Sequence, residues 1–323
     1  VTVIDLAELT NHENYLHVMA ELRKLYQPAM LWICNGSNWL VDSAEAVRKI
    51  FENIPIIDQQ VYDTKVGWIS HYNNSGVKSF DRFIAVNRHI YQKFLGDYDR
   101  GENDIDLIYP AIEESRVASR TDIERREAGK LFNLDPEQKY FATIGRFADQ
   151  KRPLLFLNMV KELQDQGHNY NFIMVGGGAL EADVDQFIVE NNLNVTRVGI
   201  LDNVKRILPL VDGLIFTSSF EGLPIAALEA LASGIPVFST DVGELRWVVE
   251  TYACGHIVDV DSTEDILATE FLKFAINVES DVYKFDEFGK RVFKDFSAVA
   301  IAEKYLESWK KGFSKYAITP SRS

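Results

Sequence analysis

The sequence is poor in cysteine, because its 323 residues include only Cys34 and Cys254, far apart along the chain. Two cysteines at this spacing form neither a disulfide framework nor the paired motif of a structural metal site. We therefore expect two free, buried thiols and a reducing compartment. This predicts a cytoplasmic protein, either free or peripheral to the inner face of the membrane.

Long hydrophobic runs are also missing. Although 46% of the residues are hydrophobic, no apolar run reaches the roughly 18 residues of a membrane-spanning helix. The opening residues VTVIDLAELTNHENYLHV have neither the basic nor the apolar region of a secretion signal. Because the first residue is not Met, we expect a preceding segment that is absent from this chain, or processing of the chain.

Basic residues are outnumbered. The chain has 34 Lys and Arg against 48 Asp and Glu, which gives a net charge of −14. This balance argues against nucleic acid as a partner and against strong electrostatic attachment to anionic lipid. Any anionic ligand must therefore be bound by cations that are gathered locally.

With 323 residues, the chain is long enough for two domains, and we expect a cleft between them. Short apolar runs alternate with amphipathic stretches over most of this length. The alternation predicts α/β architecture with parallel sheets covered on both faces. The strand and helix pairs are AMLWIC with SAEAVRKIF, FDRFIAV with HIYQKFL, YFATIG with RPLLFLNMVKELQDQG, and NFIMVGGG with EADVDQFIVENN.

A polar, charge-rich stretch at residues 102–139 is the best candidate for a linker, since a new strand is predicted directly after it. We therefore expect an N-terminal domain with its linker over residues 1–137 and a C-terminal domain over residues 138–297. Residues 298–323 contain apolar side chains at helical spacing from Val299 to Phe313, with a serine near the start that can cap a helix.

The first candidate site is GRFADQKRP, where a buried strand ends at Gly145 and Arg146 and Lys151 follow. Pro153 then indicates the start of a helix. Ligands of open parallel sheets bind at such strand ends, and Arg and Lys bind phosphate oxygens well. The alternative is a solvated loop with two surface cations.

A second glycine-rich loop follows the strand of MVGGGALEADV. Gly176, Gly177 and Gly178 allow a ligand to approach the backbone, but they do not have the spacing of a dinucleotide-binding motif. A simple tight turn explains them equally well.

The most informative stretch is SSFEGLPIAALEALASGIPVFSTDVGE, residues 218–244. Glu221 lies in the loop before a helix for which Pro224 is a first-turn residue, and Glu229 lies one to two turns inside it. The amides near Gly222 and Ile225 then form a helix N-terminus suited to an anion. The alternative places Glu221 as a partner of the helix dipole and Glu229 at a solvated position.

These motifs together resemble the retaining glycosyltransferases of family 4, which have the GT-B fold with two Rossmann-like domains. The resemblance covers residues 138–297 and depends on the two glutamates eight positions apart, on GRFADQKRP and on MVGGGALEADV. It implies a cleft between the domains and a final helix, residues 298–323, that packs back on the N-terminal domain. It also implies an enzyme of polysaccharide biosynthesis that transfers a hexose.

By this resemblance, Arg146 and Lys151 neutralise the diphosphate of a nucleotide-sugar donor and act catalytically together with Glu221, which contacts the transferred sugar. Glu229 binds the ribose hydroxyls. No metal and no cofactor is implied, and UDP is the favoured donor nucleotide, with GDP as the alternative. The implied donor-binding residues are Gly145, Arg146, Lys151, Gly176, Gly177, Gly199, Ile200, Leu201, Glu221, Gly222, Leu223, Pro224, Ile225 and Glu229.

The N-terminal part resembles only the second half of the family's acceptor domain. Where many relatives have His-Asp, this chain has Tyr62 and Asp63, and we expect nearby His71 to be a hydrogen-bonded surface histidine. The missing strands would come from a preceding segment or from a partner chain. The implied acceptor is a glycan, a lipid-linked sugar or a protein.

Two other functions remain open. An incomplete acceptor domain would suit a donor-binding or scaffolding module of a larger glycosyltransferase assembly, inactive alone. A nucleotide-sugar epimerase of the same fold is the third reading, although the glutamate pair with the basic pair fits transferases better.

Overall fold

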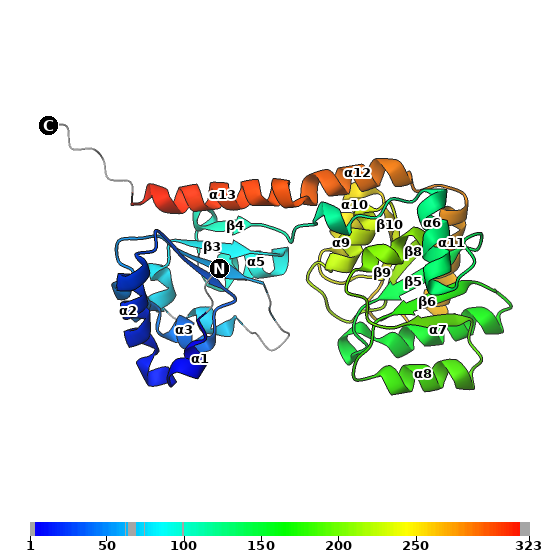
Figure 1. Cartoon of the computed structure of the whole chain (residues 1–323), viewed down its shortest axis with the longest axis horizontal. Coiled ribbons are helices and arrows are strands. Elements are labelled where there is room, and N and C mark those ends of the chain that lie inside the picture. Colours follow the sequence, from blue (N-terminus) through cyan, green and yellow to red (C-terminus); the bar gives the residue numbers. More distant parts are fainter. Residues whose placement is uncertain (1–3, 62, 64–68, 74, 99, 317–323) are drawn as a thin grey trace. The chain divides into compact units, whose positions relative to one another are not determined.

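The computed structural model of this chain describes residues 4–61, 63, 69–73, 75–98 and 100–316. The chain divides into two compact units, which we call unit 1 (Val1–Tyr109 and Ala302–Ser323) and unit 2 (Pro110–Ile301). Each unit contains one parallel sheet with helices around it (Figure 1). The predicted α/β class is therefore confirmed.

Unit 1 contains a four-stranded sheet in the order β1-β2-β3-β4, with all strands parallel. The two inner strands are buried along their whole length, as expected for parallel strands covered on both faces. Its strands are β1 (Leu31–Cys34), β2 (Ile56–Gln60), β3 (Arg82–Ala85) and β4 (Ile105–Leu107), and its α-helices before the second unit are α1 (Leu6–Leu9), α2 (Tyr15–Tyr26), α3 (Asn38–Asp42), α4 (Ala44–Ile50) and α5 (Arg88–Gly96).

Strand β1 lies at the edge of this sheet, and this explains a wrong prediction. Both cysteines are free, as expected, but only Cys254 is buried, whereas Cys34 at the end of β1 is exposed. An edge strand has a neighbour on one side only, so its side chains are covered less completely than those of an inner strand. The expectation of two buried thiols therefore fails for Cys34.

The predicted C-terminal helix is present as α13 (Ala298–Ser314). The Ser297 hydroxyl accepts a hydrogen bond from the Ala300 amide at 3.3 Å, so this serine caps the helix as predicted. Within unit 1, the Trp32 ring of β1 contacts Trp309 of α13, with ring centroids 5.4 Å apart. The apolar stripe is nevertheless only partly buried, because Val299 is 72% exposed.

Unit 2 contains a six-stranded parallel sheet in the order β10-β9-β8-β5-β6-β7. Helix α11 packs with α7, and α12 packs with α9; α9 and α11 lie on opposite sides of the strands in Figure 1. The strands are β5 (Tyr140–Ile144), β6 (Asn171–Val175), β7 (Val195–Val198), β8 (Val211–Phe216), β9 (Val237–Thr240) and β10 (Gly255–Val258). The α-helices are α6 (Asp122–Phe132), α7 (Pro153–Asp165), α8 (Glu181–Glu190), α9 (Ile225–Ala232), α10 (Leu245–Tyr252), α11 (Glu264–Glu279) and α12 (Phe285–Phe296).

The strand order of unit 2 reverses between β5 and β8. The chain moves outward from β5 through β6 to β7, and then returns to β8 and moves outward on the other side to β10. Open parallel sheets bind their ligands beyond the carboxyl ends of the strands at such a reversal. The loops that follow β5 and β8 are therefore the first place to look for a site.

An aromatic core supports the middle of this sheet. Phe141 of β5 packs edge-on against Phe271 of α11, with ring centroids 4.8 Å apart. Gly213 of β8 leaves room for these rings, since a Cβ there would lie 2.8 Å from Phe274 and 2.9 Å from Phe141. Because the core is this close-packed, the ends of β5 and β8 are held at fixed positions.

The stretch predicted as a linker, residues 102–139, contains both β4 and α6, and the boundary between the two units falls at Tyr109 and Pro110. Helix α6 begins with a capping box formed by Thr121 and Glu124. The Ala118 amide donates a hydrogen bond to the Ser233 hydroxyl at 2.8 Å. The segment before α6 is thus attached to unit 2.

None of the helices in the described ranges is long and apolar enough to cross a membrane.

Candidate functional site

The basic loop after β5 and the loop after β8 lie next to each other at the carboxyl edge of the unit 2 sheet. The Gln150 side-chain amide donates to the Phe220 carbonyl at 2.8 Å, and the Ser219 amide donates to the Gln150 carbonyl at 2.8 Å. These bonds join two segments that are about 70 residues apart in sequence. The motifs singled out from the sequence therefore meet where the strand order reverses.

The two predicted cations of the basic loop differ in their surroundings. Arg146, directly after Gly145, is exposed, and its side chain has no hydrogen bond or ion pair with any residue that the structure describes. Lys151 ends a short 3₁₀ helix, Asp149–Lys151, and its Nζ lies 2.5 Å from Oε1 of Glu221. One cation is thus free for a ligand, and the other is paired with the first glutamate.

Glu221 is almost completely buried, with 8% of its surface exposed. In addition to Lys151, the Ser218 hydroxyl donates to its Oε1 at 2.6 Å. A buried carboxylate needs such partners to remain charged. Lys151 and Ser218 therefore hold this carboxylate at a defined place beside the basic loop.

Arg152, which the sequence analysis did not select, fixes the two loops together. Its side chain donates to the Thr217 carbonyl at 2.5 Å, to the Ser218 carbonyl at 2.8 Å and to the Val260 carbonyl at 2.9 Å. Its backbone is left-handed, with φ of +47°, directly before Pro153 begins α7 as predicted. Neither feature has a signal in a single sequence, so this positioning role could not be predicted.

The glycine-rich loop after β6 packs against the loop after β5. Gly176 has φ of +130°, and a Cβ there would lie 2.0 Å from the Gly145 carbonyl oxygen. The Phe147 amide also donates to the Gly177 carbonyl at 2.9 Å. The two glycine-containing backbones are thus in direct contact at the site.

The loop before α9 also requires close backbone packing. The Glu244 amide donates to the Gly222 carbonyl at 2.9 Å, and a Cβ on Gly243 would overlap that same oxygen at 1.9 Å. Pro224 is the residue before the helix rather than a first-turn residue, because α9 begins at Ile225.

The amides of Leu223, before the N-cap Pro224, and of Ile225, the first residue of α9, have no hydrogen-bond acceptor among the described residues. For Ile225 this is usual, because the first amides of a helix have no partner within it. A helix N-terminus with free amides attracts anions, because its dipole favours negative charge. These donors follow directly after the Glu221 carboxylate in the chain.

Glu229 lies in the second turn of α9 and is buried, with 6% of its surface exposed. Burial raises the pKa of Glu229; the nearby Arg116 opposes this effect, and Glu113 adds to it. The interpretation of Glu229 as a solvated helix residue is therefore wrong. Its burial arises from packing of α9 inside unit 2, which no local pattern indicates.

Arg116 connects Glu229 with the loop after β7. Its Nε lies 3.9 Å from Oε1 of Glu229, and its Nη1 donates to the Asp202 carbonyl at 3.2 Å. The predicted residues Gly199 and Ile200 of this loop are exposed, and Leu201 is half-buried. Arg116 lies in the stretch predicted as a linker, residues 102–139, and no motif in the sequence points to it as a site residue.

A hollow of about 20 Å³ lies between these loops, lined among others by Gly145, Lys151 and Ser218. A much larger groove, of about 710 Å³, lies elsewhere on unit 2 and contains none of the predicted site residues. We place the candidate site at the small hollow, because the charged and glycine-containing motifs converge there. Among the described residues, no group of three or more His, Cys, Asp or Glu side chains could hold a metal ion.

In unit 1, Tyr62 lies outside the described residues. Asp63 is buried and accepts hydrogen bonds from Lys93 Nζ at 2.6 Å and from His89 Nε2 at 2.9 Å. His71 contacts Asp42, with 3.2 Å between Nδ1 and Oδ1, and its side chain is 38% exposed. The expectation of a hydrogen-bonded surface histidine is confirmed.

Comparison with known proteins gives a consistent result. Residues 124–280 match the model of the family Glycosyl transferases group 1. D-inositol 3-phosphate glycosyltransferase of Rhodococcus opacus is 28% identical over 200 residues, which are 58% of this chain and 44% of that protein. This chain spans less than half of the length of the curated relatives that it matches.

Solved structures extend the similarity to both units. A glycosyltransferase from Rickettsia africae has a TM-score of 0.80 at 17% identity, covering 97% of this chain and 84% of that one. An Anabaena protein, solved in complex with UDP-glucose, has a TM-score of 0.73 at 15% identity, covering 91% of this chain and 81% of that one. At these identities the similarity is one of fold.

Proposed function

Because this chain belongs, through residues 124–280, to the group 1 glycosyltransferases and has the GT-B fold, we propose that it transfers a hexose from a nucleotide-diphosphate sugar to an acceptor with retention at the anomeric carbon. The acceptor is a glycan, a lipid-linked sugar or a protein. The observation that carries the proposal is the meeting of Arg146, Lys151 and Glu221 where the strand order of unit 2 reverses.

The phosphate end of the donor lies, in this proposal, between the basic loop and the start of α9. Arg146 supplies a guanidinium with no protein partner among the described residues, and a planar guanidinium can bind two phosphate oxygens at once. The amides of Leu223 and Ile225 supply further donors. Charge develops on the diphosphate as it leaves, and fixed cations beside it lower the energy of the transition state.

In this proposal, the two glutamates bind the transferred sugar and the ribose of the donor. Glu221 contacts the transferred hexose, and its ion pair with Lys151 keeps the carboxylate beside the leaving phosphate. Glu229 binds the ribose hydroxyls, since a carboxylate accepts two hydrogen bonds from a diol. The loop of residues 199–201 borders the base, and this is supported by Arg116, which lies near Glu229 and donates to the carbonyl of Asp202 directly after that loop.

UDP is the donor nucleotide that we favour. The Anabaena protein of similar fold was solved with UDP-glucose, and this supports a UDP-hexose for the present chain. GDP-sugars are the alternative.

The test is a thermal-shift panel of UDP, GDP, ADP and CMP on the full chain, followed by incubation with the matching sugar nucleotides. A ligand at 100 times its dissociation constant stabilises the native state by about 2.7 kcal/mol. We expect one nucleotide to raise the melting temperature and its sugar form to release free nucleotide. Binding without turnover would instead indicate a donor-binding module. The absence of both binding and turnover would contradict the proposal.

A further inference from the structure

The groove of about 710 Å³ on unit 2 lies at the opposite edge of the sheet from the donor site. Its walls include the starts of strands β5 and β8, near Lys139 and Asp212, and the residues that follow α9, Ser233 and Gly234. Pockets for small molecules usually measure about 300 to 1,000 Å³. The groove therefore has the size of a ligand site and is separate from the loops described above.

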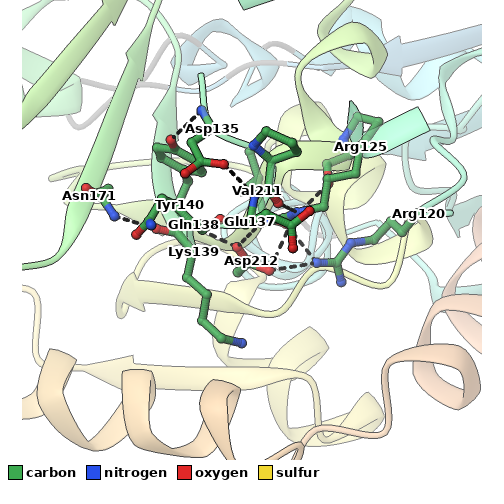
Figure 2. A network of polar contacts seen from close by, with 12 residues as sticks. Arg120, Arg125, Asp135, Glu137, Gln138, Lys139, Tyr140, Asn171, Val211 and Asp212 are labelled. Atoms are coloured by element: carbon green, nitrogen blue, oxygen red, sulfur yellow. Dashed lines mark hydrogen bonds and ion pairs between the residues drawn. The ribbon is translucent and has the colours of Figure 1, made fainter. Parts of the chain in front are cut away.

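Two guanidinium groups share one carboxylate at the floor of this groove. Arg120 Nη2 lies 3.2 Å from Oδ1 of Asp212, and Arg125 Nη2 lies 3.0 Å from its Oδ2. The Tyr140 amide donates to the same carboxylate at 2.9 Å. Figure 2 shows both arginines converging on Asp212. The floor thus contains one more positive charge than negative charge.

Arg120 is the less well satisfied of the two. Its Nη atoms donate to the carbonyls of Gly234 and Val211 at 3.1 Å each, but its buried Nε has no acceptor among the described residues. Burial lowers the pKa of Arg120, and Arg125 lowers it further, whereas Asp212 and, to a smaller extent, Asp286 oppose this effect. Its guanidinium also lies over the Phe285 ring, 5.6 Å from the centroid. The positive charge here is only partly compensated.

The rim adds three exposed cations, Arg126, Lys139 and Lys290. Their side chains form no ion pair with any residue in the described ranges. In Figure 2, the Lys139 side chain extends away from the Asp212 network. With the acidic Asp122, Glu137, Asp212 and Asp286, the groove has five cationic side chains against four acidic ones, on a chain whose net charge is −14.

We propose that this groove is a second binding site, for a small phosphate-bearing anion. Lys139 and Lys290 on the rim contact the phosphate, and the two arginines at the floor supply the positive field that attracts it. Asp212 neutralises only one of the two arginine charges, and a bound phosphate would neutralise the remaining positive charge. Its oxygens also accept hydrogen bonds from the ammonium groups of the lysines. The site does not depend on the donor site and requires no chemical step.

The test is calorimetric titration of the full chain with inorganic pyrophosphate at low ionic strength. The variant Lys139→Ala/Lys290→Ala removes the two lysines among the three rim cations, and both lysines are exposed, so folding should be unaffected. Its matched control is Lys130→Ala/Lys294→Ala, which removes two exposed lysines from α6 and α12 outside the groove. Arg146→Ala reports on the donor site separately.

We expect pyrophosphate binding that weakens at least tenfold in Lys139→Ala/Lys290→Ala and persists in the control and in Arg146→Ala. Charge reversal in Lys139→Glu/Lys290→Glu should abolish the binding of pyrophosphate in the groove. An unchanged melting temperature of this variant would show that it is still folded. The proposal is overturned if the two rim variants bind as the original chain does, or if Arg146→Ala alone removes all binding.

Discussion

Lys151 and Glu221 are 70 residues apart in sequence, yet Nζ and Oε1 lie 2.5 Å from each other between the loops that follow β5 and β8. The lysine side chain is 24% exposed and the glutamate side chain 7% exposed. The pair therefore does two things at once. It joins the two loops, and it places a cation and a carboxylate together at the proposed donor site.

Removing Lys151 should cost stability as well as activity. In Lys151→Ala, the Glu221 carboxylate loses its cation while it remains buried, and we expect the free energy of unfolding to fall by about 1 to 3 kcal/mol. Glu221→Gln in the same chain should recover part of this loss, because the amide carries no charge. Urea denaturation of the single and double variants measures the coupling, and strictly additive losses would contradict it.

Arg146→Ala should affect ligand binding alone. Because its side chain has no partner among the described residues, we expect the free energy of unfolding to change by less than about 0.5 kcal/mol. The affinity for the preferred nucleoside diphosphate should fall by about 1 to 3 kcal/mol, or roughly 5-fold to 150-fold. Lys130→Ala, on the exposed face of α6, is the control for the loss of one positive charge. Equal affinities for the two variants would remove Arg146 from the site.

Glu229→Gln should make the protein more stable and bind its ligand less well. Burial raises the pKa of Glu229 above the usual 4.5. As the pH rises, the Glu229 carboxyl therefore loses its proton in the unfolded chain at a lower pH than in the folded chain. The free energy of unfolding consequently falls as the pH rises above about 4.5. The glutamine variant avoids this loss, and we expect it to exceed the original chain in stability at pH 7 but not at pH 4. A nucleotide titration at pH 7 should show weaker binding.

Asp58 should produce a larger pH effect in unit 1. This carboxyl is fully buried on β2, and burial raises its pKa to about 7, against hydrogen bonds from Tyr72 and Gln60 that lower it. Between about pH 4 and pH 7 the unfolded chain ionises while the folded chain keeps the proton. The free energy of unfolding should therefore fall over this range, by up to about 4 kcal/mol.

Asp58→Asn tests this effect, because the amide does not titrate. Its free energy of unfolding, measured by denaturation from pH 4 to pH 8, should vary less with pH than that of the original chain. Parallel curves for the two proteins would show that Asp58 ionises normally in the folded state.

Much of the donor-side fold could be predicted from local patterns. The strand predicted at residues 140–145 is β5, and Pro153 begins α7 as expected. These signals depend on hydrophobic periodicity and on the restricted backbone of proline, which act within a few residues. The order of the strands, and so the meeting of two distant loops at the reversal, has no such local signal.

Burial and long-range partners could not be predicted in the same way. Glu229 has the pattern of a surface helix residue, and its burial and its approach to Arg116 depend on segments far away in the chain. Arg152 fixes two loops together by donating hydrogen bonds to the carbonyls of Thr217 and Ser218, which lie far away in the sequence. The exposure of Cys34 has a related cause, because only the strand order shows that β1 is an edge strand.

Unit 1 is built from two separate stretches of the chain, and this affects the order in which the protein can fold during synthesis. All of unit 2 has been made once Ile301 has left the ribosome, whereas unit 1 still lacks the part of α13 that brings Trp309 to Trp32. Nascent chains generally fold domain by domain from the N-terminus. Unit 1 is therefore begun before unit 2 and completed after it, and the contact between the indoles of Trp32 and Trp309 cannot form until the later part of α13 has been made.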